Sequence, residues 1–332
     1  MTRIAVVGAG SWGTALANLL VQKGEQVVLW AFEKEVVEEI NNRHRNDLFL
    51  PEAPLHKELR ATHDIAEAVK GAEVIVSVAP SHAVRAVMSC AAPSVAKGAL
   101  VISASKGLES NGLNRMTEVL RAVLPGHSDI VALSGPTFAR EVYEQQPTAA
   151  SAAGPAEAAE RAQKVMSTPY FRVYTNDDPI GVELGGALKN VVAIAAGILE
   201  GLGMGSNPRA ALLTRGLAEI TRLGVAMGAK PQTFAGLAGM GDLVLTATGP
   251  LSRNRSLGAE LGKGATLESI MARRLSVAEG VGTAKAAVAL SERVGVELPI
   301  AREVARVLFE GKPARQAIGD LMERSPKSEA AA

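Results

Sequence analysis

The sequence contains little cysteine, few aromatic residues and almost no net charge. Its 332 residues include one cysteine, Cys90, which excludes an internal disulfide framework and a zinc cluster of cysteines. Thirty-five basic and 34 acidic side chains give a formal charge of +1, and aromatic residues make up 3% of the chain. Nucleic-acid binding requires a basic surface, so this composition argues against a nucleic-acid partner. Cys90 stands beside alanines and is expected to be a small buried residue.

Signals for metal binding and for membranes are also missing. The five histidines show no spacing typical of paired ligands, so no metal is expected. No apolar run approaches about 20 residues without a charge, so no transmembrane helix is expected. The opening MTRIAVVGAG leads into a strand and a glycine turn, not a cleavable signal, and the expected location is cytoplasmic.

The first half of the chain alternates between strand-like runs and helical stretches. The runs are apolar on both faces, as in strands covered by helices on both sides. The alternation predicts right-handed crossovers and an α/β fold with a doubly wound parallel sheet. The expected strands are residues 3–8, 26–30, 73–78, 99–105 and 129–135, with two more near 148–153 and 171–175. The expected helices include residues 10–23, 33–43, 81–92 and 155–166.

The second half carries helical patterns with almost no strand signal. Pro208 is expected in the first position of a long helix that ends near Met227. Further helices are expected at residues 253–261, 266–273, 282–294 and 299–310. We therefore expect two domains, residues 1–180 and an all-helical domain of residues 181–324. Residues 325–332 have no apolar period and are expected to be a disordered tail.

A glycine motif links the first strand to the first helix. The segment Gly8-Ala9-Gly10-Ser11-Trp12-Gly13 matches G-x-G-x-x-G between a strand and a helix. Gly8 permits a tight turn, Gly10 lets a pyrophosphate approach the backbone, and Gly13 allows close helix packing. The helix N-terminus then favours the phosphates. In this context the motif predicts dinucleotide binding. A glycine turn that binds another ligand is the alternative.

The choice between NAD and NADP is open from the sequence. Glu33 lies 20 residues beyond Gly13 and is placed to accept a hydrogen bond from a ribose 2′-hydroxyl, which favours NAD. Phe32 offers no charge to a 2′-phosphate, although Lys34, Arg43 and Arg45 are near in sequence.

A single lysine, Lys189, interrupts the apolar stretch of residues 183–200. At helical period its neighbours are small or apolar, and an unpaired ammonium there costs roughly several kcal/mol. Because desolvation lowers the pKa of a lysine, such a residue suits general acid–base chemistry. The alternatives are a side chain that reaches the surface or one that pairs with a distant carboxylate.

Three further segments have the character of a site. Lys106 follows the fourth strand, and Gly135 and Thr137 follow the fifth, at the sheet edge where ligands bind in α/β folds. For these the alternative is ordinary loop chemistry. Asp242 lies in a glycine turn, with Thr246 one helical turn later.

The segment TGPLSRNRSLG offers a helix start that suits an anion. Ser252 is the expected N-cap, followed by Arg253, Asn254 and Arg255. Cations in a first turn oppose the helix dipole unless an anion arrives, and a phosphate would meet Arg253 in a bidentate fork. A solvated basic patch is the alternative.

Together these residues resemble the soluble, bacterial NAD(P)-dependent glycerol-3-phosphate dehydrogenases. The matching segments are GAGSWGTALA (8–17), SASKGLE (103–109), SGPTFAREV (134–142), ELGGALKNVVAIAAGI (183–198), GLAGMGDLVLTATG (236–249), SRNRSLG (252–258) and VAEGVGTA (277–284). The resemblance implies a Rossmann-type N-terminal domain, followed by an all-α C-terminal domain like that of 6-phosphogluconate dehydrogenase. It also implies dihydroxyacetone phosphate and sn-glycerol 3-phosphate as substrates, phospholipid synthesis as the purpose, and a homodimer.

Residue roles follow from the resemblance by position. The catalytic residues implied are Lys189 as general acid or base, Lys106, Asp242 and Thr246. The implied substrate contacts are Lys106, Gly135, Thr137, Lys189, Asp242, Ser252, Arg253 and Asn254. The implied cofactor contacts are Gly8, Gly10, Ser11, Trp12, Gly13, Phe32, Glu33, Lys106, Ala139, Arg253, Val277 and Glu279. Phe32 departs from the histidine or arginine common at this position in the family, which puts strong NADP preference in doubt.

Two other functions fit parts of the sequence. A dehydrogenase for a hydroxy acid or a pantoate-like carboxylate would also use a helical lysine and an arginine-bound anion. A non-catalytic NAD(H) sensor would need neither Lys189 nor Asp242. The basic helix start at Ser252 favours a phosphorylated substrate over the first alternative.

Overall fold

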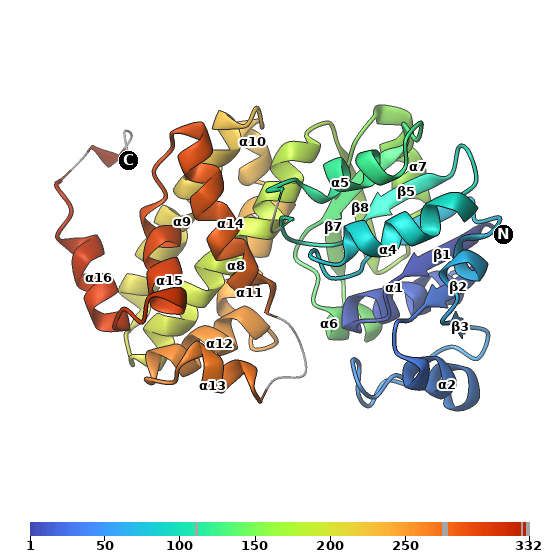
Figure 1. Cartoon of the computed structure of the whole chain (residues 1–332), viewed down its shortest axis with the longest axis horizontal. Helices are drawn as coiled ribbons and strands as arrows, with labels where there is room; N and C mark the ends of the chain where they lie inside the picture. Colours follow the sequence, from blue (N-terminus) through green and yellow to red (C-terminus); the bar gives the residue numbers. More distant parts are fainter. Residues whose placement is uncertain (110–111, 274–277, 327, 330–332) are drawn as a thin grey trace. The chain divides into compact units, whose positions relative to one another are not determined.

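The computed structural model describes residues 1–109, 112–273, 278–326 and 328–329, and the chain forms two compact units (Figure 1). The first unit contains residues 1–109 and 114–183, and the second contains the described residues of 110–113 and of the chain from Leu184 onward. Half of the expected tail, Lys327 and residues 330–332, lies outside the described residues.

An eight-stranded sheet forms the first unit, in the order β3-β2-β1-β4-β5-β6-β7-β8. The pairs from β3 to β6 are parallel, β6 and β7 are antiparallel, and β7 and β8 are parallel. The strands are β1 (Arg3–Val7), β2 (Gln26–Trp30), β3 (Arg60–Thr62), β4 (Val74–Ser77), β5 (Leu100–Ser103), β6 (Ile130–Ser134), β7 (Thr148–Ala153) and β8 (Phe171–Asn176). The order 3-2-1-4-5-6 is that of a Rossmann fold, which confirms the predicted fold class.

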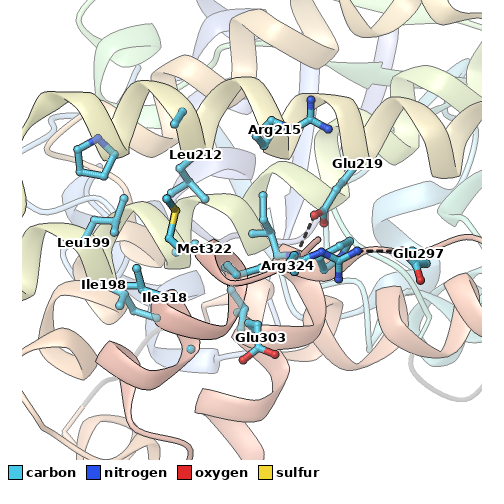
Figure 2. A pocket seen from close by; sticks show the side chains of 18 of the residues that line it. Ile198, Leu199, Leu212, Arg215, Glu219, Glu297, Glu303, Ile318, Met322 and Arg324 are labelled. Carbon is cyan, nitrogen blue, oxygen red and sulfur yellow. Dashed lines mark hydrogen bonds and ion pairs between the residues drawn. The ribbon is translucent and has the colours of Figure 1, made fainter. Parts of the chain in front are cut away.

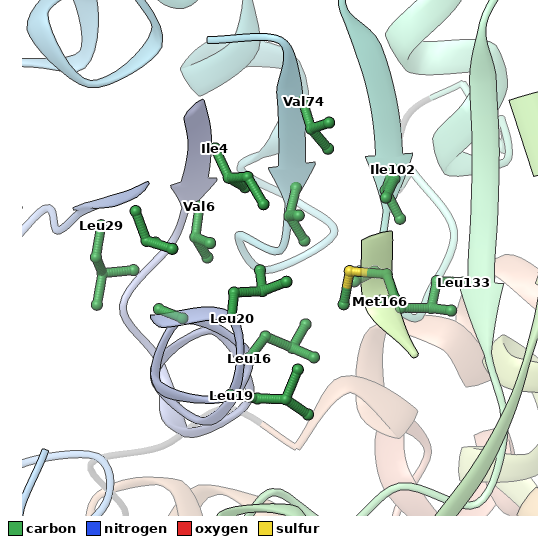
Figure 3. Close-up of a cluster of buried hydrophobic side chains, with 14 of the residues drawn as sticks. Ile4, Val6, Leu16, Leu19, Leu20, Leu29, Val74, Ile102, Leu133 and Met166 are labelled. Atoms are coloured by element: carbon green, nitrogen blue, oxygen red, sulfur yellow. The ribbon is translucent and has the colours of Figure 1, made fainter. Parts of the chain in front are cut away.

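Helices cover both faces of this sheet, and strand residues alternate between them. Ile4 and Val6 join a core with helix α1, whereas Ala5 and Val7 face the other side. Leu16, Leu19 and Leu20 of α1 pack under the central strands, as Figure 3 shows. The first face carries α1 (Ser11–Gln22), α2 (Lys34–Arg43), α6 (Ala139–Tyr143) and α7 (Ala156–Met166). The second carries α3 (Ile65–Val69), α4 (Val84–Ala91) and α5 (Met116–Val123).

Several details of the first unit differ from expectation, including the antiparallel pairing of β7 with β6 in a sheet that was expected to be parallel. The strand β3 and the helix α3 were not predicted, because Arg60–Thr62 is three residues long and has no apolar run to mark it. Cys90 is exposed, so the prediction that it is buried was wrong. Helix α4 turns Val84, Met88 and Ala91 toward the sheet, which leaves Cys90 on its outer side.

The second unit is helical. Its helices are α8 (Pro179–Gly201), which begins in the first unit, α9 (Ser206–Ala226), α10 (Pro231–Phe234), α11 (Asp242–Thr248), α12 (Arg253–Gly262), α13 (Leu267–Met271), α14 (Glu279–Val294), α15 (Pro299–Phe309) and α16 (Ala314–Met322). A π-helical turn, Leu237–Gly241, precedes α11. Helices α10, α11 and α16 were not predicted. Pro208 is third in α9, not first, which is tolerated because first-turn N–H groups have no partner within a helix.

Helix α8 owes its start to an aspartate followed by proline. The Asp178 carboxylate accepts a hydrogen bond from the Gly181 N–H (2.9 Å), and Pro179 takes the first helical position. The helix is long and apolar enough to cross a membrane by length and composition, but 94% of its most apolar window is buried within the protein. Its apolar side chains are therefore packed inside the protein, as in a core helix.

Candidate active site

The three motif glycines meet different constraints in the glycine turn. Gly8 has a φ of +123°, and a Cβ there would lie 2.8 Å from the Ala79 nitrogen. A Cβ on Gly13 would lie 1.8 Å from the Gly8 oxygen. A Cβ on Gly10 would meet no atom within 4 Å. The protein's own packing therefore explains Gly8 and Gly13, whereas Gly10 leaves open the space through which a pyrophosphate would approach.

The space beside Gly10 adjoins the N-terminus of α1. Ser11 and Trp12 are the first residues of α1, and its first turn contains no acidic residue. The N–H groups and the positive end of the helix dipole at this point therefore favour an anion. The Trp12 ring lies 6.3 Å from that of Phe171, and its buried Nε1 has no hydrogen-bond partner among the described residues. These features fit a dinucleotide.

Phe32 and Glu33 follow the second strand. Phe32 is 71% exposed, and its ring lies 6.4 Å from that of His63. Glu33 is the N-cap residue of α2 but makes no side-chain capping bond. Its carboxylate therefore does not cap the N-terminus of α2.

Lys106, Gly135 and Thr137 come together in the first unit. Lys106 Nζ donates to the Gly135 carbonyl (2.9 Å) and to Thr137 Oγ1 (3.2 Å). Strands β5 and β6 are parallel neighbours, so the segments after them meet at one sheet edge. Ala139 opens α6 directly after this group.

Lys189, Asp242 and Thr246 come together in the second unit. Lys189 is 5% exposed, and its ammonium donates to the Asp242 carboxylate and to Thr246 Oγ1 (2.9 Å). Asp242 begins α11 and Thr246 lies four residues later, so both side chains share one face of that helix. The alternative that Lys189 reaches the surface is wrong. The alternative that Lys189 pairs with a distant carboxylate agrees with the structure, and that carboxylate is Asp242, which was itself predicted as a site residue.

The start of α12 is capped as expected, but one of the arginines in its first turn is already paired with a carboxylate of the protein. Ser252 Oγ accepts from the Arg255 N–H (3.2 Å). Arg255 donates to the Gly249 carbonyl (3.1 Å) and pairs with Glu200, so a carboxylate of the protein already balances this cation. Arg253 is exposed at the first position of α12.

Asn190 is a buried polar residue that the sequence analysis missed. Its Oδ1 accepts from Asn254 Nδ2 (2.9 Å), and Asn254 Oδ1 accepts from the Gly280 N–H (3.0 Å). A Cβ on Gly280 would lie 2.7 Å from Asn254 Oδ1. The available signal was the position of Asn190 beside Lys189. Two amide contacts fix Asn254, a predicted substrate ligand, near the start of α14.

Two predicted cofactor contacts lie near that helix start. Glu279 is the first residue of α14 and is half-buried. Val277 lies outside the described residues. Within the ranges described above, no group of three or more His, Cys, Asp or Glu side chains is arranged to hold a metal.

A cavity of about 780 Å³ in the second unit lies apart from these groups (Figure 2). Helices α8, α9, α15 and α16 line it with apolar residues such as Ile198, Leu212 and Ile318, and neither Lys189 nor Asp242 belongs to its lining. Glu219 points into it and accepts from the N–H groups of Ile300 (2.8 Å) and Ala301 (3.3 Å). Burial raises the pKa of Glu219 to about 7.

Comparison with known proteins identifies relatives over nearly the whole chain. Residues 3–160 match the family described as NAD-dependent glycerol-3-phosphate dehydrogenase N-terminus, and residues 178–319 match the corresponding C-terminus. Glycerol-3-phosphate dehydrogenase [NAD(P)+] of Geobacter sp. (strain M21) is 54% identical over 330 residues, 98% of each chain. The Myxococcus xanthus protein of the same name is 51% identical over 99% of each chain.

Solved structures agree with these sequence matches. Glycerol-3-phosphate dehydrogenase from Coxiella burnetii is 40% identical, with a TM-score of 0.93 over 97% of this chain and 99% of that one. A PanE/ApbA family ketopantoate reductase from Ralstonia eutropha has a TM-score of 0.64 at 16% identity, over 97% of this chain and 100% of that one. The second likeness concerns the fold alone.

Proposed function

Because the chain belongs to the NAD-dependent glycerol-3-phosphate dehydrogenase family, we infer that it is an NAD(P)-dependent oxidoreductase that acts on glycerol 3-phosphate. The reaction is reversible hydride transfer between NAD(P)H and dihydroxyacetone phosphate, which gives sn-glycerol 3-phosphate. The observation that carries the chemistry is the buried Lys189 ammonium held by Asp242 and Thr246.

We propose that Lys189 moves the proton at the substrate C2 oxygen. When bound, the nicotinamide supplies or accepts the hydride. In reduction, Lys189 donates a proton to the developing alkoxide, and in oxidation it removes one. Asp242 and Thr246 both accept hydrogen bonds from the ammonium, and the Asp242 carboxylate also balances its charge. The two residues therefore hold the ammonium in place. A fixed cation at a developing negative charge lowers the barrier without reorganisation.

The Lys106 group is proposed as a second source of positive charge. The Gly135 carbonyl and Thr137 hydroxyl accept hydrogen bonds from Lys106 and so fix its direction. Lys106, Gly135 and Thr137 are proposed to contact the substrate, and Lys106 and Ala139 the cofactor.

The start of α12 is proposed as the phosphate site. Ser252 caps the N-terminus of α12, and Arg253 is exposed at its first position. Asn254 is fixed by Asn190 and the Gly280 N–H. A guanidinium at a helix N-terminus suits a phosphate dianion, because it adds a bidentate fork to the free N–H groups. Arg253, Val277 and Glu279 are also proposed as cofactor contacts.

The remaining cofactor contacts proposed are those of the first βα turn and the end of β2: Gly8, Gly10, Ser11, Trp12, Gly13, Phe32 and Glu33. A cytoplasmic location, a homodimer, and supply of sn-glycerol 3-phosphate to phospholipid synthesis are proposed from the family.

The initial rate of NADH or NADPH oxidation with dihydroxyacetone phosphate tests the function. We expect rapid oxidation that depends on the phosphorylated ketone. Ketopantoate is the matched control, since a ketopantoate reductase shares the fold. A rate with ketopantoate that exceeds the rate with dihydroxyacetone phosphate would favour a carboxylate substrate. NAD(H) binding without turnover on either compound would favour a sensor.

A further inference from the structure

A buried carboxylate fixes the second turn of α8 to the N-terminus of α5. Glu183 accepts from the Thr117 N–H (2.7 Å), from Thr117 Oγ1 (2.6 Å) and from Arg115 Nη1 (2.6 Å). The Arg115 and Glu183 side chains are 8% and 7% exposed. A carboxylate with three donors, one of them charged, makes strong contacts in such a place. We call Glu183, Arg115 and Thr117 the Glu183 clamp.

The α5 side of the clamp is itself held in place. Arg115 is the N-cap residue of α5, and its N–H donates to Glu118 Oε2 (2.8 Å) while its guanidinium donates to Glu118 Oε1 (2.8 Å). Glu183 then satisfies the Thr117 N–H, which has no partner within a helix start, and places negative charge at the positive end of the dipole. Burial raises the pKa of Glu183, and Arg115 and Thr117 act in the opposite direction.

The clamp lies on the stretches of chain that carry both predicted catalytic lysines. Arg115 follows Lys106 by nine residues, and Glu183 is the last residue of the first unit. Helix α8 continues without interruption into the second unit, where Lys189 follows roughly 9 Å along the axis. The clamp therefore fixes the N-terminal part of the same helix that carries Lys189.

We propose that Glu183 is a positioning residue for hydride transfer, which acts through α8 on Lys189 and does not itself contact substrate or cofactor. The inference rests on the proposed function. Loosening the clamp lets the Lys189 ammonium drift from the reacting oxygen, and a misplacement of about 1 Å costs roughly 100-fold in rate.

The experiment compares three variants of the full chain. Glu183→Gln keeps the shape of the side chain but turns an amide toward Arg115 or the Thr117 N–H. Thr117→Val removes one of the donors and leaves the charges. Glu109→Gln is the control, because Glu109 forms an ion pair with Arg85 (2.5 Å) in the first unit, and its side-chain hydrogen bonds among the described residues are with Arg85 and Asn114, outside α8. The readouts are kcat per cofactor site, with the sites titrated by NADH fluorescence, and the isotope effect with (4-²H)NADH.

We expect Glu183→Gln to lower kcat per site by about 10- to 100-fold, with an isotope effect no smaller than that of the wild type and NADH affinity within about twofold. Thr117→Val shifts kcat in the same direction by less, and Glu109→Gln leaves it unchanged. A clamp that only maintains the fold would lower the number of sites but not kcat per site, and that result overturns the inference. If Glu183→Gln does not fold, an unchanged kcat per site in Thr117→Val overturns it instead. A wild-type protein that does not turn over dihydroxyacetone phosphate refutes the proposed function first, which separates the two failures.

Discussion

Lys189 and Asp242 form an ion pair inside the helical unit, although 53 positions separate them in the sequence. Their side chains are 6% and 1% exposed. Burying two charges is costly, and the pair is retained only with good geometry and further hydrogen bonds, which Thr246 supplies. Such a pair is weak evidence for stability, because well-packed apolar residues of similar volume often stabilise a protein as well, and it is therefore consistent with a role in chemistry.

Replacing Lys189 by alanine is expected to lower turnover by a factor of about 1,000 or more, because the proton donor at the C2 oxygen is lost. The change also leaves Asp242 buried without its cation, at a cost of about 3–5 kcal/mol in the free energy of unfolding. Turnover and thermal unfolding measure the two effects.

The double variant Lys189→Ala/Asp242→Asn separates chemistry from stability. We expect it to recover part of the lost stability, because the uncompensated charge is gone, and none of the turnover. NADH affinity, measured by fluorescence, should stay close to that of the wild type in both variants. Near-normal turnover in Lys189→Ala would show that another group moves the proton.

The glycine turn allows a matched pair of variants. Gly13→Ala would place a Cβ 1.8 Å from the Gly8 oxygen, so it is expected to destabilise the protein by about 3 kcal/mol or more. Gly10→Ala meets no atom of the protein within 4 Å and should cost about 1 kcal/mol or less. We expect Gly10→Ala to fold but to bind NADH about tenfold more weakly or worse, because the methyl group occupies the pyrophosphate path. Equal NADH affinity in Gly10→Ala and the wild type would contradict this placement of the cofactor.

Local sequence patterns were enough to predict the strands and helices that bury a regular stripe of apolar side chains. The strands with long apolar runs, such as β1 and β6, and the long helices α8 and α9 are all recognisable from period and composition. The helices α10 and α11 were missed because they flank a glycine-rich π-helical turn whose backbone is set by packing. A Cβ on Gly185 would lie 2.5 Å from the Ala238 oxygen, a contact that no local pattern reveals.

The candidate site follows the same division. Residue types and positions in the chain marked Lys106, Lys189 and Asp242, and ordinary rules for α/β sheets placed Lys106 at a strand end. The partners of these residues depend on tertiary packing. The Lys189–Asp242 pair, the Asn190–Asn254 amide contact and the Arg255–Glu200 pair join residues about 50–65 positions apart, where periodicity carries no information.

Cofactor preference is expected to depend on Phe32. Its side chain is exposed directly after β2 and brings no charge. Phe32→Arg adds a guanidinium that suits a 2′-phosphate, so the ratio of kcat/KM for NADPH to that for NADH should rise by about tenfold or more. Phe32→Gln, which is polar but neutral, is the control and should change this ratio little. A rise of equal size in both variants would show that loss of the ring, not gain of charge, sets the preference.

Glu219 is expected to make stability fall with rising pH. Burial raises its pKa from 4.5 to about 7, while the N–H groups of Ile300 and Ala301 and the charges of Arg222 and Arg324 act in the opposite direction. Between these two values the folded state holds the proton more tightly than the unfolded state. The free energy of unfolding therefore decreases as pH rises from about 5 to 8, by roughly 2 kcal/mol from this residue.

Glu219→Gln isolates this effect. The glutamine keeps an oxygen that accepts from the Ile300 N–H but does not titrate, so its stability should depend less on pH than that of the wild type. Urea unfolding of both proteins at pH 5.5 and pH 8 measures the difference. We expect the variant to gain on the wild type as pH rises, because ionised Glu219 is buried at pH 8 and neutral at pH 5.5. Parallel pH profiles for the two proteins would mean that the carboxylate is held ionised across this range, and that the N–H groups of α15 outweigh its burial.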